Sequence, residues 1–357
     1  VLSSVFTADR AYHLFDITAF RLPLFFSSVD GFSFPVLVAS QRLLFLAAGL
    51  AMILATAAFP SRPPGRRSAP AAAGAVAFLA LALSVFAAAG YAGYFHEGAK
   101  MRERIREISG GIRPVPRLAP VEYAIDVDQE GRGVVCVVSV VVENRSDEPV
   151  EVYVFTLNPG LEVSSVSGRG RTMAFERDLH LLKVLPPAAL GPGERDTIEV
   201  RYAGIVDGRA MFSDVPGEVR GGDSSFGEMV FADMSLPGLD MFRVKRDLAP
   251  ARYDYILLVP DAMWYPVPGL PYDPCFPGED HRDFSRFRLR VRPGEGLKAV
   301  SQGKQTAGED GSFCFEPEHP LKGITLAIGD FTVRTLTAGK TQYQLCSKPG
   351  SEDLFRT

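Results

Sequence analysis

The feature that most constrains this chain is a change of composition near Tyr94, where long apolar runs give way to a polar, strand-like pattern. From Ala71 to Tyr94 no residue is charged, and Ser84 is the one uncharged polar side chain apart from tyrosines. A helix of this length spans roughly 36 Å, more than the ~30 Å hydrocarbon core of a bilayer. A buried helix of a globular domain does not need to be apolar on every face. The run therefore predicts a transmembrane helix near residues 71–94.

A second apolar run lies upstream, from Leu43 to Phe59. It predicts another span, which can begin earlier in the apolar stretch 32–40, with Arg42 at its start reaching the membrane interface. An amphipathic or re-entrant segment is the alternative. Neither run fits a signal peptide, because the first lies too far from the start and the second lacks a small-residue cleavage site followed by an acidic mature start.

The ends of the chain also carry an expectation. The sequence starts with Val1 rather than Met and stops at Thr357 within a polar stretch. We expect a fragment of a longer protein, in which residues 349–357 begin a further domain.

Charge around the two runs indicates how they are oriented. The connector of residues 60–70 carries Arg62, Arg66 and Arg67 and no acid, so the positive-inside rule places it in the cytoplasm. The region after Tyr94 would then lie outside the cytoplasmic membrane. A competing signal is the basic residues just beyond the second run, which alternate with acids at helical spacing: Lys100, Arg102, Arg104 and Arg106 with Glu97, Glu103 and Glu107. We favour the extracytoplasmic location.

Residues 95–118 predict a charged helix and a linker, and from about Ala119 the apolar period becomes two. Short alternating or β-branched runs follow, separated by turns such as Asn158-Pro159-Gly160 and Gly191-Pro192-Gly193. These runs are 123–127, 134–142, 150–155, 161–166, 198–202, 287–291 and 323–335. The pattern predicts an all-β domain, an antiparallel sandwich or open β-saddle, with a long excursion over residues 207–248.

The cysteines leave the redox compartment open. Four widely spaced cysteines allow three pairings, and the sequence selects none of them: Cys136, Cys275, Cys314 and Cys346. Cys136 lies in an alternating run and Cys314 lies between two phenylalanines, so both are predicted to be buried free thiols.

Four landmarks then occur in order. The first is Leu190-Gly-Pro-Gly-Glu194, followed by alternating residues to Tyr202 and Gly204, and the second is Ala262-Met-Trp-Tyr-Pro266. The third is Phe287-x-Leu-x-Val291 with Gly296-Leu-x-Ala-Val-Ser-x-Gly303, and the fourth is Leu326-Ala-Ile-Gly-Asp-Phe331. Together they resemble the N-terminal β-domain of aminopeptidase N-like zinc metallopeptidases. The resemblance covers residues 119–348 and implies the fold of that N-terminal domain.

The Trp264-Tyr-Pro266 variant, with Arg42-Leu-Leu-Phe-Leu46 opening a span, further resembles bacterial proteins that join an ABC transporter permease to an aminopeptidase N-like part. This resemblance implies that residues 1–94 end a permease-like region in a multi-pass protein of the bacterial inner membrane. It also implies a lipid bilayer, a following catalytic domain and a peptide substrate as partners, and an ABC ATPase subunit is a further candidate.

The zinc chemistry of that family needs a His-Glu-x-x-His helix. The five histidines include no such motif: His13, His96, His180, His281 and His319. The nearest sequence, His96-Glu97-Gly-Ala-Lys100, has lysine in place of the second ligand. The Gly-Ala-Met-Glu-Asn element of the family is also absent. We therefore predict no catalytic, cofactor-binding or metal-binding residue in this chain, and expect zinc in the missing catalytic domain.

Other candidates favour structural explanations. Some family members supply a Glu or Gln about nine residues before the proline of the second landmark, but Leu257 stands there and Asp261 is the nearest acid. Asp280-His281-Arg282-Asp283 reads as a solvated loop, and residues 217–227 match no phosphate-binding loop or nucleophile elbow. Asn144-Arg-Ser146 matches a glycosylation acceptor, as many chance triplets do.

The alternating arginines near the third landmark predict a basic stripe: Arg286, Arg288, Arg290 and Arg292. With a net charge of −4 and no aromatic interleaving that fits base stacking, a solvated outer face is favoured over nucleic-acid binding. Trp264 and Tyr265 are predicted to anchor the core, with the wall of a cleft as the alternative.

We favour a membrane-anchored, noncatalytic N-terminal domain of a zinc aminopeptidase-like protein fused to an ABC transporter permease, which shapes the peptide-substrate cleft. The second possibility is a permease component whose extracytoplasmic β-domain is a binding or docking module without peptidase activity. The third is a tethered adhesive sandwich domain.

Overall fold

The computed structural model describes residues 14, 29, 35–58, 68–112, 118–211, 251–270, 282–308, 310–339 and 341–350. It divides into two compact units, Val1–Ala99 and Lys100–Thr357. Several sequence-based predictions lie outside the described residues: the excursion beyond residue 211, the connector arginines, His13, Cys275, His281 and the residues after 350.

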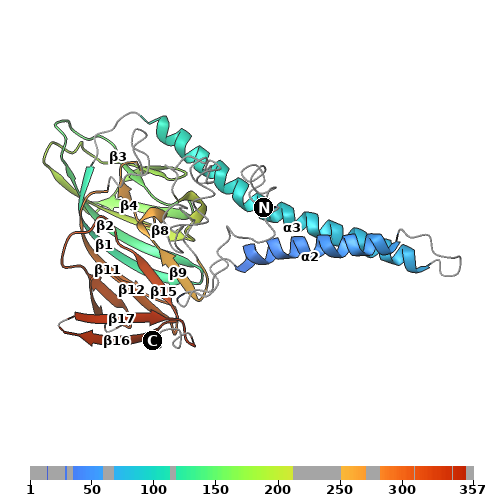
Figure 1. Ribbon diagram of the computed structural model, residues 1–357. Coiled ribbons are helices and arrows are strands. Elements are labelled where there is room, and N and C mark those ends of the chain that lie inside the picture. The colour runs from blue at the N-terminus through green and yellow to red at the C-terminus, as the bar shows by residue number, and fades with distance from the viewer. Residues whose placement is uncertain are drawn as a thin grey trace, which may run out of the picture. The chain divides into compact units, whose positions relative to one another are not determined.

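The first unit contains two long apolar helices, α2 (Pro35–Ala58) and most of α3 (Ser68–Gly110) (Figure 1). By length and composition, Pro35–Thr56 and Ala72–Gly110 contain stretches apolar enough to cross a membrane. The first helix begins at Pro35, before the predicted Leu43, because proline is tolerated in the first turn of a helix. The predicted span and the predicted charged helix form one continuous helix, α3. The composition changes near residue 94, but the helix does not break there.

The two helices contact each other through a narrow strip of mainly small residues. The buried positions recur at intervals of three and four: Leu44, Ala47 and Ala51 on α2, and Ala80, Ser84, Ala87 and Tyr91 on α3. Ser84 Oγ donates a hydrogen bond to the Leu44 carbonyl oxygen at 3.0 Å. The hydroxyl of Ser84 is thereby satisfied between the helices, as an apolar environment requires.

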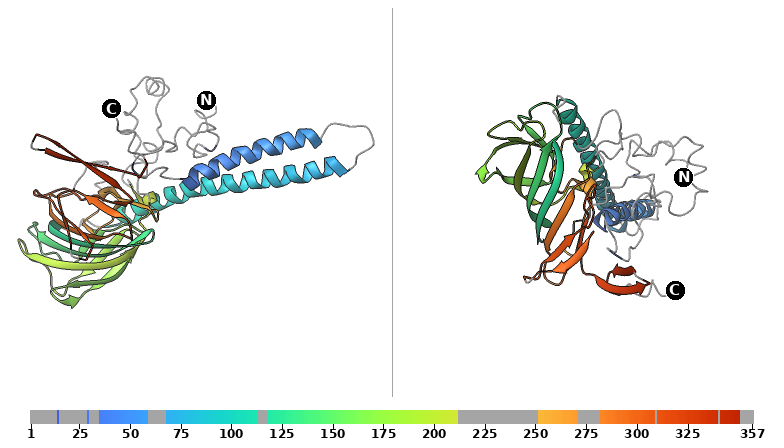
Figure 2. Two further views of the ribbon diagram at one scale, coloured as in Figure 1. Left: turned by 90° about the horizontal axis from the view of Figure 1, so that it is seen from below. Right: turned by 90° about the vertical axis from the view of Figure 1, so that its left-hand side faces the viewer.

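The second unit, from residue 118 onward called the β-domain, has three sheets around one core and a separate hairpin (Figures 1 and 2). The large sheet has the order β13 (Lys304–Ala307), β14 (Phe313–Glu316), β11 (Arg286–Arg292), β1 (Leu118–Glu130), β2 (Gly133–Asn144), β8 (Arg195–Gly204), β4 (Leu161–Gly168), β5 (Arg171–Thr172). The second sheet has β10 (Val267–Pro268), β3 (Tyr153–Thr156), β7 (Leu181–Leu185) and β6 (Ala174–Asp178). The third has β12 (Lys298–Ser301), β15 (Leu326–Gly329) and β9 (Tyr255–Leu258), and the hairpin is β16 (Thr332–Ala338) with β17 (Thr341–Ser347).

Alternation in the sequence decides which face of each strand enters the core. On β1, Tyr123, Ile125 and Val127 are buried, and on β2 every second residue from Val134 to Val142 is at most 2% exposed. Since successive side chains of a strand point to opposite faces, one face of the large sheet is apolar. Its side chains form one core with those of the two smaller sheets. The all-β prediction is confirmed.

The predicted antiparallel arrangement is wrong for one strand pair, at the centre of the large sheet. There β1 and β11 run parallel, with Tyr123 opposite Phe287. Parallel neighbours need a long crossover connection, and more than 150 residues separate these strands in the sequence. The antiparallel prediction rested on short strands separated by turns, and this local pattern does not indicate how two strands so far apart in the sequence pair.

The predicted strand 323–335 is also divided. It forms β15 in the third sheet and β16 in the separate hairpin. Between them Phe331 is 2% exposed and packs edge-on against Tyr255, with ring centroids 6.1 Å apart. This buried ring anchors the point where the chain leaves the third sheet.

Gly204, the last residue of the first landmark, is required by a close backbone approach. Its φ is +147°, and a Cβ there would lie 2.2 Å from the Gly160 carbonyl oxygen. A Cβ on Gly160 would in turn lie 2.0 Å from the Ile205 carbonyl oxygen. Two glycines therefore let the ends of β4 and β8 meet.

Candidate functional site

The second landmark, Ala262 to Pro266 and called the Trp264 segment, is shaped by its backbone. Its first residue, Ala262, is the last of the short 3-10 helix η2 (Pro260–Ala262), and the C-cap residue Met263 has a left-handed φ of +53°. Strand β10 follows directly. This abrupt turn directs the side chains of Trp264 and Tyr265 into the core.

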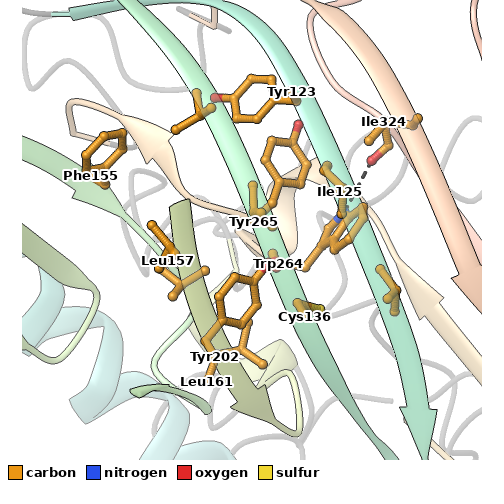
Figure 3. Close-up of a cluster of buried hydrophobic side chains, with 14 of the residues drawn as sticks. Tyr123, Ile125, Cys136, Phe155, Leu157, Leu161, Tyr202, Trp264, Tyr265 and Ile324 are labelled. Atoms are coloured by element: carbon orange, nitrogen blue, oxygen red, sulfur yellow. Dashed lines mark hydrogen bonds between the residues drawn. The ribbon is translucent and has the colours of Figure 1, made fainter. Parts of the chain in front are cut away.

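Trp264 is fully buried and Tyr265 is 2% exposed (Figure 3). Trp264 Nε1 donates a hydrogen bond to the Ile324 carbonyl oxygen at 3.2 Å, and the Tyr202 hydroxyl donates to the Trp264 carbonyl oxygen at 2.8 Å. The Tyr265 ring lies 5.3 Å from that of Tyr123 and 5.9 Å from that of Phe287. The core interpretation of the aromatic pair is confirmed, and the cleft-wall alternative is wrong for these two side chains.

Asn158, from the predicted Asn-Pro-Gly turn, forms side-chain hydrogen bonds to the backbone around this segment. Its side chain is fully buried. Nδ2 donates to the carbonyl oxygens of Ala262 (2.7 Å) and Asp207 (3.1 Å), and Oδ1 accepts from the backbone N–H groups of Gly160 (2.9 Å) and Asp207 (2.8 Å). One amide thus joins three loops that are far apart in the sequence.

The arginine stripe lies on the exposed face of β11, with every second residue exposed. The parallel register sets acids of β1 beside it, including Glu122 opposite Arg286 and Asp128 opposite Arg292. Arg292 pairs with Asp128, and Arg288 lies 3.7 Å from Glu122. A groove of about 750 Å³ runs over this face, lined by acids and bases of β1, β11, β13 and β14. Opposite charges in register make it a mixed surface rather than a basic one.

A buried polar cluster lies elsewhere in the β-domain. His180, between β6 and β7, is fully buried, and its Nε2 is hydrogen-bonded to Ser109 Oγ at 2.9 Å. Burial, and secondarily the charge of Arg177, lowers the pKa of His180 to about 4. Arg177 donates to the carbonyl oxygens of Leu157, Asn158 and His180 at 2.9, 2.8 and 3.3 Å. Among the described residues no carboxylate is hydrogen-bonded to this Ser–His pair, and its burial keeps a substrate away, so we assign it no nucleophilic role.

The described residues do not form a zinc site. In the part of the chain that the structure describes, no three His, Cys, Asp or Glu side chains gather in a group that could hold a metal ion. His96 is exposed on α3 and His319 is exposed in the turn after β14, while Nε2 of His180 is engaged by Ser109. We therefore derive no metal-dependent step for this chain.

The remaining candidates have structural surroundings. Leu257 lies in β9, and Asp261 is 3.3 Å from Arg282 in an ion pair. Asn144 is fully buried, and its Nδ2 donates to the carbonyl oxygens of Glu148 and Leu190, so this nitrogen is not presented to a glycosylating enzyme.

The two cysteines predicted to be buried differ in their exposure. Cys136 is free and buried, and burial raises its pKa to about 12, whereas Cys314 is free but only half-buried. The buried-thiol prediction holds for Cys136 and is wrong for Cys314, because Cys314 lies on the face of β14 that lines the groove.

Sequence reasoning missed the Ser109–His180 pair. The two residues are 71 positions apart, and nothing in either local pattern indicates the other. A weak signal was present, since His180 is flanked by Leu179, Leu181 and Leu182. An apolar setting of this kind favours burial of a histidine.

Comparison with known proteins gives no relative by sequence. No protein-family model matches the chain, and no curated protein matches it.

Comparison with solved structures gives distant likenesses. A two-domain M1 zinc metallopeptidase bound to L-tryptophan has a TM-score of 0.44 and 17% identity, over 65% of this chain and 48% of that one. The M1 zinc metallopeptidase of Deinococcus radiodurans has a TM-score of 0.43 and 17% identity, over 64% and 46%. Yeast LTA4 hydrolase has a TM-score of 0.40 and 12% identity, over 65% and 31%. The matched region spans less than half the length of each of these structures, and likenesses of this size establish neither family nor activity.

Proposed function

We propose that this chain is the membrane-anchored, noncatalytic N-terminal part of a zinc aminopeptidase-like protein fused to an ABC transporter permease. Its β-domain would shape one side of the peptide-substrate cleft and hold a following catalytic domain near the bilayer. Zinc and the residues that bind it would belong to that following domain.

The observation that carries the proposal is the meeting of the sequence landmarks in one core. Tyr202 of the first landmark binds the carbonyl oxygen of Trp264 in the second. Phe287 of the third packs against Tyr265, and Leu326 of the fourth belongs to the same buried cluster. Motifs chosen for their resemblance to one family are thus packed against one another, which supports reading them as one inherited unit.

The membrane anchor is supported by the two apolar helices. Their outer surfaces carry large apolar side chains, among them Leu46, Phe78 and Phe86, which are 72%, 71% and 77% exposed. A lipid environment would bury these surfaces. The arginine-bearing connector supports a cytoplasmic loop and an extracytoplasmic β-domain in the bacterial inner membrane.

The gene beyond the codon for Thr357 tests the enzymatic part of the proposal. We expect a Gly-Ala-Met-Glu-Asn element followed by His-Glu-x-x-His within about 150 codons, a length set by the size of one domain. The purified chain alone should contain much less than one zinc per molecule by metal analysis. An open frame without either motif would favour the permease with a docking β-domain, and stoichiometric zinc in this chain would refute the noncatalytic assignment.

Sidedness is tested by labelling cysteine variants in intact spheroplasts, with the native cysteines replaced. Lys304→Cys lies on the fully exposed edge strand β13, and Arg66→Cys lies in the connector. A membrane-impermeant maleimide should label the first and leave the second unlabelled until the membrane is permeabilised. The reverse pattern would place the β-domain in the cytoplasm, and labelling of both variants in intact spheroplasts would contradict a cytoplasmic connector.

A further inference from the structure

The last turns of α3 pack against the β-domain in a small apolar cluster of their own. Ile105 is fully buried in a cluster with Ala210 and Met263, the latter from the Trp264 segment. Arg102 Nη1 donates to the Arg209 carbonyl oxygen at 3.0 Å. The helix thus contacts two loops of the β-domain. Its apolar face is removed from water in this contact, which favours closure.

One polar contact closes this interface, between Ser109 Oγ and His180 Nε2 at 2.9 Å. Both side chains are at most 2% exposed. The other ring nitrogen, His180 Nδ1, is buried and has no hydrogen-bond partner among the described residues. A neutral imidazole tolerates this arrangement, because Nδ1 can be the tautomeric nitrogen that carries no proton.

A protonated imidazole does not tolerate it. Protonation puts an N–H on Nδ1 with no described acceptor and adds a positive charge to a buried site. The charge that acts on the pKa of this histidine is that of Arg177, from β6, and it is also positive. Ser109, from α3, is a neutral hydroxyl and cannot compensate the charge.

We infer that the end of α3 is an acid-released clasp, which neutral His180 keeps closed on the β-domain and which protonation of His180 opens. The inference depends on contacts within the second unit and does not rest on the proposed function. Opening would free residues 100–110 and expose Met263. The solvent exposure of the Trp264 segment would then depend on whether the helix end is bound.

The size and sign of the effect follow from linkage. The pKa of His180 is about 4 when the clasp is closed and takes the ordinary value of 6.5 when it is open and solvated. The open state then binds the proton more tightly, so acid favours it. Closure is unaffected above pH 6.5, weakens as the pH falls below that value, and has lost about 300-fold in its equilibrium constant once the pH is below 4.

Hydrogen exchange by mass spectrometry on the full chain in detergent micelles tests the clasp. After correction for the intrinsic pH dependence of exchange, peptides covering residues 100–112 should lose protection between pH 6.5 and 4. Peptides from β2 should stay protected over the same range. Loss of protection in both regions at the same pH would mean global unfolding, and unchanged protection of residues 100–112 would mean that acid does not open the clasp; either result overturns the inference.

Two variants make the test specific. His180→Gln keeps a polar group that can reach Ser109 but does not titrate, so its residues 100–112 should stay protected at pH 4. His319→Gln, at an exposed turn, should behave like the unmodified chain. An acid response retained by His180→Gln would overturn the inference.

Ser109→Ala provides a second route if His180→Gln does not fold. Removing the hydroxyl should weaken closure about tenfold at pH 7, the value of one ordinary hydrogen bond. The acid response should persist, because His180 is still present. Protection at pH 7 equal to that of the unmodified chain, or an acid response that disappears, would contradict the clasp.

Discussion

Replacing Trp264 with alanine lowers the free energy of unfolding of the β-domain by about 3–5 kcal/mol, the usual cost of deleting a large buried aromatic ring. The indole is fully buried, and Nε1 also loses its bond to the Ile324 carbonyl oxygen. The ring packs edge-on against Tyr265, with centroids 5.0 Å apart, so a cavity opens beneath the Trp264 segment. Urea unfolding of the full chain in detergent, followed by far-ultraviolet circular dichroism, measures the change.

Two control variants separate packing from the mere loss of an aromatic side chain. Tyr253 is 74% exposed, and Tyr253→Ala should cost less than about 0.5 kcal/mol. Trp264→Phe retains most of the ring volume and loses the N–H donor, so its effect should fall between the two. A Trp264→Ala protein as stable as Tyr253→Ala would mean that the segment is not a core anchor.

Asn158→Ala should cost about 3–4 kcal/mol, although it deletes only a small polar group. The side chain makes four hydrogen bonds while fully buried, and each contributes about 1 kcal/mol net. After the substitution the backbone groups of Asp207, Gly160 and Ala262 lose this partner inside the protein. Fluorescence of Trp264, the one tryptophan of the chain, reports urea unfolding of this variant directly.

Ser164→Ala is the matched control for Asn158. Its hydroxyl also bonds a backbone carbonyl, that of Arg201 at 3.1 Å, but in an exposed position where water can replace it. We expect a change below about 0.5 kcal/mol. Equal effects of the two substitutions would show that Asn158 does not join the three loops.

Local patterns in the sequence were sufficient for elements in which one short stretch determines the outcome. The unbroken apolar composition of residues 71–94 predicted a long helix, and α3 includes all of it. Alternation along residues 123–127 predicted the buried face of β1, with Tyr123, Ile125 and Val127 inside. A tryptophan followed by tyrosine and proline predicted a core anchor. Period and apolar content act over a few residues, so they can be read from one stretch.

Pairings between distant stretches were decided by the tertiary structure. The parallel alignment of β1 with β11 sets acids beside the arginine stripe, and neither strand carries a sign of the other. The contact between Ser109 and His180 likewise depends on how a helix end packs against a loop 71 residues away. The sequence by itself determined where α3 and strands such as β1 form and which face β1 buries, because those properties depend on local periodicity. The tertiary structure decided which charges face one another and which histidine is held neutral, because these depend on the distance and burial that packing alone creates.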